Sequence, residues 1–162
     1  MYTFEEWKKN LIIVRGGGDI ATGTIYKLYQ SRFSVLVLEI ANPSCIRRTI
    51  SFCEAVFDKK VEVEGVTAKR AESLEDAFAI YGQGQIPVMI DENGSMIQEV
   101  QPPVVVDAIL AKRNLGTKIT DAPAVIGVGP GFCAGKDVDA VIETQRGHNL
   151  GRVIYEGEAA PN

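Results

Sequence analysis

The chain has 162 residues, 46% of them hydrophobic, and a formal net charge of −4 at pH 7. This length and apolar content predict a single domain over residues 1–162 with one sizeable core. The acidic balance argues against a nucleic-acid partner and against an anionic membrane surface, because both select basic patches. No apolar run approaches the roughly 20 residues that cross a bilayer. The three cysteines are an odd number and do not suggest a disulfide framework, so we expect a cytoplasmic protein.

The first forty residues predict a β-α-β unit. Phe4–Lys9 is a candidate short helix, and Leu11–Val14 is an apolar run typical of a buried strand. Apolar residues recur at helical spacing over Asp19–Gln30, and Val35–Ile40 is a second apolar run of strand length. A parallel, right-handed crossover is expected for such a unit.

The middle of the chain continues the alternation. Asn42-Pro43-Ser44 predicts the start of a helix that runs to Ala55, and KKVEVEGVTAKR (59–70) alternates like one half-exposed strand. Glu72–Tyr81 is a predicted helix. Ile86–Ile90 is a predicted strand, and the turn signal Glu92-Asn93-Gly94 predicts that it folds back on a strand at Ser95–Val100.

The last third of the chain predicts strands rather than helices. Val104–Val106 and Ala124–Val128 have the composition of buried strands, and Val138–Glu143 and Arg152–Tyr155 flank a loop as an antiparallel pair would. The predicted fold class is therefore α/β, a Rossmann-like, mostly parallel sheet with an antiparallel C-terminal portion.

The first glycine loop, Gly16-Gly17-Gly18-Asp19-Ile20-Ala21, matches the pattern G-x-G-x-x-A between a strand and a helix. Such a loop lets the backbone approach a pyrophosphate and points a helix N-terminus at the anion. Glu39 follows at the spacing of about 20 residues expected for a carboxylate that binds a ribose hydroxyl, and Arg15 could supply positive charge. The alternative is a plain strand-to-helix turn in which Asp19 caps the helix and Glu39 is solvated.

A second glycine loop follows the predicted strand Ala124–Val128 and contains Gly127, Gly129 and Gly131. Glycines at this density are expected to serve close backbone approach or positive φ rather than packing. Ligands of open α/β sheets bind beyond the carboxyl ends of the strands. We therefore expect both glycine loops, together with Asp107, to form one ligand cleft.

The cysteines have different predicted roles. Cys133 lies within the second glycine loop, where a thiol with a lowered pKa could act as a nucleophile or a sulfur carrier. The alternative for Cys133 is a small buried residue that fills the loop. Cys45 and Cys53 are expected to pack in the core on the predicted 42–55 helix. None of the three belongs to a CxxC motif and the chain has one histidine, so no metal site is predicted.

Polar residues gather in the loop between the last two predicted strands. Arg146 could bind an anionic substrate, and His148 could carry a proton as a catalytic residue, with Glu143 nearby. The alternative is a hairpin loop with ordinary polar side chains.

Four segments of the chain resemble a known family: RGGGDIATG, EGVTAKRAES, VVVDAILAKRN and, above all, GVGPGFCAGKDVDAVIETQRGHNLGRVI. They look like the YqeB-type accessory proteins of selenium-dependent molybdenum hydroxylases. This family is more loosely similar to the XdhC/CoxI accessory proteins, which handle molybdenum cofactor for xanthine dehydrogenase-like enzymes. The resemblance extends from about Ile12 onward, and its long C-terminal motif is specific.

The resemblance implies an accessory protein that helps to mature a molybdenum hydroxylase, with the hydroxylase apoenzyme as its partner. It would bind molybdopterin or its dinucleotide and assist insertion, or sulfur or selenium loading, of that cofactor. Cys133 would then be the chalcogen carrier. Family members extend well past residue 162, so we expect the chain to be truncated relative to the family. A homo-oligomer is compatible with the sequence.

Two other functions fit the residues. One is an NAD-dependent oxidoreductase, with Glu39 on the adenosine ribose and His148 as the acid or base. The other is a non-catalytic scaffold that contacts the hydroxylase.

Overall fold

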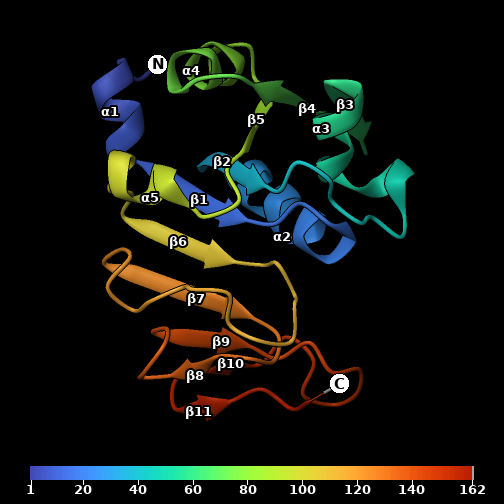
Figure 1. The fold of residues 1–162 in the computed structure, drawn as a ribbon, viewed down its shortest axis with the longest axis vertical. Coiled ribbons are helices and arrows are strands. Elements are labelled where there is room, and N and C mark those ends of the chain that lie inside the picture. Colours follow the sequence, from blue (N-terminus) through green and yellow to red (C-terminus); the bar gives the residue numbers. More distant parts are fainter. Residues whose placement is uncertain (162) are drawn as a thin grey trace.

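The computed structural model describes residues 1–161 as an α/β, Rossmann-like fold built on a nine-stranded sheet (Figure 1). The strand order is β10-β9-β7-β6-β1-β2-β5-β4-β3, and β8 and β11 form a separate two-stranded sheet. The strands are β1 (Leu11–Arg15), β2 (Ser34–Glu39), β3 (Lys60–Val63), β4 (Val66–Ala71), β5 (Ile86–Ile90), β6 (Val104–Asp107), β7 (Ala124–Val128), β8 (Cys133–Ala134), β9 (Ala140–Ile142), β10 (Val153–Ile154) and β11 (Gly157–Glu158).

The sheet is parallel from β4 to β9 and antiparallel at its two edges. β9 pairs with β10 and β4 pairs with β3 in antiparallel register, whereas β7, β6, β1, β2 and β5 pair in parallel. The predicted fold class is confirmed, including the antiparallel C-terminal portion. The antiparallel edge at β3 was not predicted.

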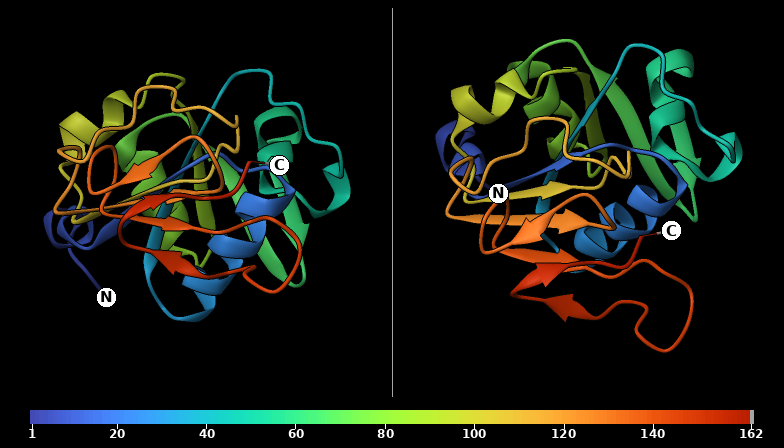
Figure 2. Two further views of the ribbon diagram at one scale, coloured as in Figure 1. Left: turned by 90° about the horizontal axis from the view of Figure 1, so that it is seen from below. Right: turned by 60° about the horizontal axis from the view of Figure 1, so that its bottom comes forward.

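Helices cover both faces of the N-terminal two thirds of the sheet (Figure 2). Successive β1 residues point to opposite faces, so Ile12 and Val14 pack with α2 while Leu11 and Ile13 pack with α1, α4 and α5. The helices are α1 (Phe4–Lys9), α2 (Asp19–Gln30), α3 (Ala55–Asp58), α4 (Leu74–Gly82) and α5 (Ser95–Val100), with short 3-10 turns η1 (Arg48–Ile50) and η2 (Phe52–Glu54). None of these helices is long and apolar enough to cross a membrane.

The C-terminal third carries no helix within the described residues, and its strands extend the sheet away from the helical layers (Figure 1). It has a small core of its own around Phe132, Val125 and Val141, which Ala159 of the last described segment helps to close.

Three predicted elements are wrong. The helix expected from Asn42 to Ala55 is irregular chain with 3-10 turns, and only Ala55–Asp58 is α-helical. Residues 44–50 are exposed or partly exposed, with Ile46 at 94%, so this stretch buries no helical face, and its β-branched residues favour helix weakly.

The other two errors concern turns. The single strand expected at 59–70 is a hairpin, because Glu64 and Gly65 both adopt positive φ (50° and 78°) as a tight two-residue turn requires. The strand expected at Ser95–Val100 is helix α5. The Asp91 carboxylate accepts the backbone N–H groups of Ser95 and Met96 and so caps that helix.

Candidate functional site

The candidate site lies at the carboxyl edge of the sheet, where β1, β2 and β6 end. The connection from β1 leads to β2 on one side, whereas β6 pairs on the other side of β1. This is the topological switch point at which open α/β sheets bind ligands. Arg15 and Asp107 are register partners in neighbouring strands, and Glu39 ends β2 at the same edge.

Two glycines of the first loop serve close packing within the protein. Gly16 has a φ of +95°, and a Cβ on it would lie 2.8 Å from the carbonyl oxygen of Ala108. A Cβ on Gly17 would lie 3.1 Å from the backbone nitrogen of Cys53. Both glycines thus serve close backbone approach, and Gly16 also adopts positive φ, but what approaches them is the protein's own backbone.

Gly18 is different, because nothing lies within 4 Å of the position of its Cβ. It precedes the twelve-residue helix α2 with extended backbone (φ −66°, ψ −174°) and has no side-chain cap. The backbone N–H groups of Gly18 and Asp19 have no acceptor among residues 1–161. Two free donors at the positive end of a helix dipole are a suitable site for one phosphate group.

Glu39 lies beside these donors. Its carboxylate accepts the N–H of Gly17 and the N–H of Ile40, each at 2.8 Å. Burial raises the pKa of Glu39 above its usual value, while the Ile40 and Gly17 hydrogen bonds oppose the rise. The carboxylate therefore occupies the place predicted for a ribose-binding acid, but it also holds the glycine loop in shape.

Arg15 and Asp107 belong to one buried hydrogen-bond network, and both are at most 5% exposed. The Thr117 hydroxyl donates to the Asp107 carboxylate at 2.6 Å and accepts from the Arg15 guanidinium at 3.0 Å. No carboxylate forms an ion pair with Arg15 within the described chain. Asp107 nevertheless offsets the charge of Arg15 through the shared Thr117 hydroxyl, and the Arg15 donors are directed at Thr117 and the Glu92 carbonyl.

Two small adjoining cavities lie over this edge, with volumes of about 140 and 120 Å³. Both are lined by Gly16, Glu39, Ile40 and Ile109. The first also touches Arg15, and the second touches Gly18. Ligand pockets for complete cofactors measure roughly 300–1,000 Å³, so each cavity has room for a phosphate or a ribose but not for a dinucleotide.

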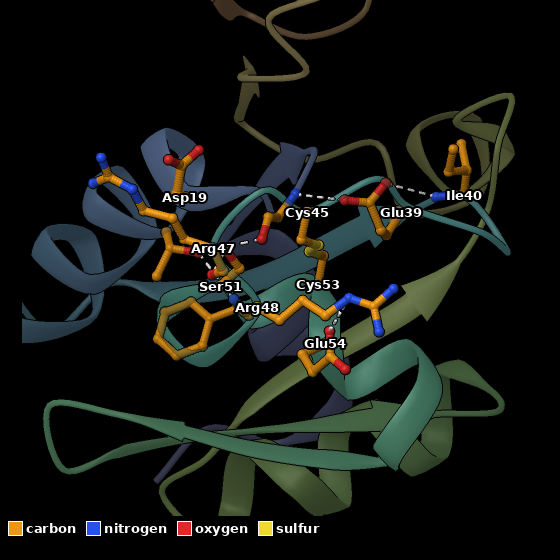
Figure 3. The surroundings of a disulfide bond; sticks show 12 residues. Asp19, Glu39, Ile40, Cys45, Arg47, Arg48, Ser51, Cys53 and Glu54 are labelled. Carbon is orange, nitrogen blue, oxygen red and sulfur yellow. Dashed lines mark hydrogen bonds and ion pairs between the residues drawn. A yellow bond between two sulfur atoms is a disulfide. The ribbon is translucent and has the colours of Figure 1, made fainter.

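The segment from Pro43 to Cys53 covers the cavity beside Gly18 and contains a disulfide between Cys45 and Cys53. Figure 3 places Glu39 on one side of this disulfide and the Asp19 and Arg47 side chains on the other. Cys53 is fully buried, as predicted, but Cys45 is partly exposed. The expectation of two helical core cysteines without a disulfide is therefore wrong.

The glycines of the second loop are all in contact with protein. A Cβ on Gly127 would lie 2.6 Å from the Phe132 ring, one on Gly129 would lie 2.7 Å from Leu110, and one on Gly131 would lie 2.7 Å from the Arg113 backbone. The segment 108–117 therefore lies between the two glycine loops, because Gly16 also contacts it at Ala108. None of the three second-loop glycines lines either cavity, so the expected single cleft is not formed there.

Cys133, the predicted chalcogen carrier, lies on β8 opposite Glu158 of β11. It is a free thiol and partly buried, and its Sγ lies 3.9 Å from the Ala134 carbonyl oxygen. It lines neither of the two cavities. Its assignment as a carrier remains a prediction.

The Glu143, Arg146 and His148 set is only partly assembled. Glu143 is 6% exposed, and its carboxylate accepts the N–H groups of Ala160 and Gln145. These two bonds, Ala160 first, lower the pKa of Glu143, and burial opposes them. Arg146 and His148 are exposed in the 144–151 loop, so Glu143 fastens the C-terminal segment rather than orienting His148.

Sequence reasoning missed Thr117 and the covering segment Pro43–Cys53. A single threonine in a loop carries no pattern that would reveal its buried partners. The covering segment did carry one signal: it follows the carboxyl end of β2, the edge at which open α/β sheets bind ligands.

Comparison with known proteins finds one curated relative, "Uncharacterized protein YqeB" of Escherichia coli strain K12, 53% identical over 152 residues. The match covers 94% of this chain but only 28% of that protein, so the chain spans under a third of the relative's length. No protein-family model matches the chain, and no solved structure matches it either. The chain is thus similar to YqeB over nearly its whole length.

Proposed function

We propose that the chain is part of a cytoplasmic accessory protein that binds a phosphate-bearing pterin or nucleotide cofactor for a molybdenum hydroxylase. The observation that carries the proposal is the pair of N–H groups at Gly18 and Asp19 that have no acceptor among residues 1–161, at the start of α2, where Gly18 lines a cavity at the switch point. The similarity to YqeB fits the resemblance of the C-terminal motif to accessory proteins of such enzymes.

The residues fit one phosphate of molybdopterin or of its dinucleotide. Gly18 and Asp19 would donate backbone N–H bonds to that phosphate, and the absence of a Cβ at Gly18 leaves room for it. The neighbouring cavity is less suited to an anion, because Glu39, Asp91 and Glu92 line it together with Arg15. The cofactor itself supplies the redox chemistry of the hydroxylase, whereas this chain binds, orients and releases it.

The carboxylate of Asp19 weakens the attraction of this site for an anion. It accepts the N–H of Ile20 at 3.1 Å and therefore places a negative charge at the start of α2. The exposed Arg47 of the covering segment, which has the opposite charge, lies on the same side of the disulfide as Asp19 (Figure 3).

An NAD-dependent oxidoreductase is the second candidate, and Glu39 at the end of β2 favours it. His148 belongs to the loop between β9 and β10, however, and β1, β6 and β7 separate β9 from β2 in the sheet. At about 4.8 Å per strand, an acid or base at His148 would lie far from a ribose at Glu39.

Calorimetric titration of the purified chain with NAD, molybdopterin and molybdopterin cytosine dinucleotide tests the proposal. Gly18→Asp is the control, because it adds a carboxylate at the free donors. Binding of the pterin dinucleotide that the control abolishes supports cofactor handling. Preference for NAD would favour the oxidoreductase, and no binding of any ligand by the folded chain would leave only a scaffold.

The chalcogen-carrier role of Cys133 is tested separately. Cys133→Ser is expected to abolish hydroxylase maturation in cells and to leave cofactor binding intact, because Cys133 lines neither cavity. Unchanged hydroxylase activity in this variant would rule the role out.

A further inference from the structure

We propose that Cys45 and Cys53 form a thiol–disulfide exchange site that controls access to the cavity beside Gly18, with a dithiol reductant as its substrate. Both cysteines line that cavity, together with Gly18 and Glu39. The effect on ligand binding rests on the proposed function, whereas the exchange reaction does not.

The two sulfurs differ in accessibility, as an exchange pair requires. Cys45 is partly exposed on the covering segment, whereas Cys53 is 0% exposed and its backbone N–H donates to the Gly17 carbonyl at 2.8 Å. An incoming thiolate therefore reaches the Cys45 sulfur first, and Cys53 is the leaving group held against the glycine loop.

The reaction balances with the dithiol alone. One thiolate of the reductant attacks Cys45 Sγ, the Cys45–Cys53 bond breaks, and Cys53 leaves as a thiolate that takes up a proton. The second thiol of the reductant then attacks the mixed disulfide and releases Cys45 as a thiol. The reductant becomes a disulfide, and the protein gains two electrons and two protons.

The disulfide is the main tie on one arm of the covering segment. Backbone N–H groups from Ser44 to Arg47 have no acceptor within residues 1–161. The other arm is anchored, because the Phe52 N–H donates to the Thr22 hydroxyl at 2.9 Å and Ser51 is 0% exposed. The Arg47 carbonyl accepts from the Ser51 hydroxyl at 2.7 Å and from the Ile50 N–H at 3.1 Å. Reduction should therefore leave the 44–47 arm attached at its Arg47 end, free its Ser44–Cys45 end from Cys53, and leave Cys53 in place.

Freeing this end of the arm matters because the closed cavity is small. At about 120 Å³, it admits a phosphate but not the body of a pterin dinucleotide. The oxidised protein would thus be closed to the complete cofactor, and the reduced protein would be open.

The first test measures exchange without any ligand. A Cys133→Ser background leaves only the pair, and the native protein is treated with dithiothreitol, alkylated with iodoacetamide and weighed by mass spectrometry. One alkyl group without denaturant is expected, on the partly exposed Cys45, because Cys53 stays buried, and a second is expected when urea is then added to the reduced protein. A pair that resists reduction until urea is added would overturn the proposal.

Limited proteolysis then measures the opening. Trypsin should cut after Arg47 or Arg48 about tenfold faster in the reduced protein, because cleavage follows the open population. Arg146, in the exposed 144–151 loop, is the internal reference site whose cleavage should not change. Equal rates at Arg47 and Arg48 in both redox states would overturn the opening.

Calorimetry with molybdopterin cytosine dinucleotide completes the test. Reduced protein and the Cys45→Ser variant should both bind at least about tenfold more tightly than oxidised protein, since affinity scales with the fraction of open molecules. Equal affinity in both states would overturn control of access. Absence of binding in every form would instead refute the proposed function, and the exchange would be judged by alkylation and proteolysis alone.

Discussion

The two glycine loops look alike in sequence but differ in what lies next to their glycines. Each follows a buried strand of the parallel sheet, and each contains closely spaced glycines. In the second loop, other protein atoms occupy the space where a Cβ on Gly127, Gly129 or Gly131 would lie. In the first loop, Gly16 and Gly17 are packed in the same way, and Gly18 alone faces open space. Glycine density therefore indicates close approach, but what approaches is often another part of the same chain.

Two buried or partly buried carboxylates, Glu39 beside the first glycine loop and Glu143 in the C-terminal third, differ in a similar way. Glu39 and Glu143 each accept two backbone N–H groups, yet their pKa values shift in opposite directions. At Glu39, which is partly exposed at the end of β2, burial outweighs the two hydrogen bonds and raises the pKa. At Glu143 the bonds from Ala160 and Gln145 outweigh burial and lower the pKa. The balance of burial against hydrogen bonding, rather than the number of bonds, decides the sign of the shift.

The largest expected effect is from Gly131→Ala. The new Cβ would meet the Arg113 backbone, and φ is +110°, so we expect a loss of about 2–4 kcal/mol in the free energy of unfolding. Gly135→Ala is the matched control, because its φ is +87° but nothing lies within 4 Å. Urea denaturation measures both, and an equal loss in the two variants would show that packing at Gly131 is unimportant.

Thr117→Val should cause the next largest loss of stability. Thr117 lies in the segment 108–117, which separates the two glycine loops, and its hydroxyl joins Arg15 to Asp107. The variant keeps the shape but removes the hydroxyl that joins the Asp107 carboxylate to the Arg15 guanidinium, so each loses one of its hydrogen bonds. We expect a loss of about 2 kcal/mol in urea denaturation. Thr117→Ser retains the hydroxyl and should lose much less; if the two variants lose the same amount, the hydrogen bonds are not the cause.

The contributions of Glu143 and Glu39 to stability should depend on pH in opposite directions. The pKa of Glu143 is lowered on folding, so its stabilisation is complete above its unfolded pKa and is lost as pH falls through the folded value. The destabilisation caused by Glu143→Gln should therefore shrink towards acid pH, as measured by thermal unfolding. A constant difference at every pH would contradict the assignment.

Glu39 should behave in the reverse way. Its pKa is raised on folding, so its favourable contribution is present below its unfolded pKa and is lost as pH rises through the folded value. The gap in melting temperature between the protein and Glu39→Gln should thus be widest in acid and narrow as pH rises. A gap that widens with rising pH would show that burial does not dominate at Glu39.

The smallest expected effect is from Gly18→Ala. Its φ of −66° suits any residue, and its Cβ position is open, so stability should change by less than about 0.5 kcal/mol. Cofactor affinity should fall nonetheless, because the methyl group enters the proposed phosphate site. A large loss of stability would mean that Gly18 is packed like Gly16.

The sequence by itself determined the order of most strands and helices and the Rossmann-like class. Apolar runs such as Leu11–Val14 and the helical spacing in Asp19–Gln30 are local patterns that burial on both faces of a parallel sheet imposes. It also located the first glycine loop and Glu39 at one sheet edge, because parallel strands end on the same side.

Only the tertiary structure decided which groups are free and which are occupied. That Gly131 meets Arg113, that Thr117 joins Arg15 to Asp107, and that Cys45 meets Cys53 are contacts between irregular segments. Such segments have no periodicity, so their partners depend on how the sheet edge and its covering loops pack together. The same packing closes the expected cleft between the loops and leaves the N–H groups of Gly18 and Asp19 without an acceptor among residues 1–161.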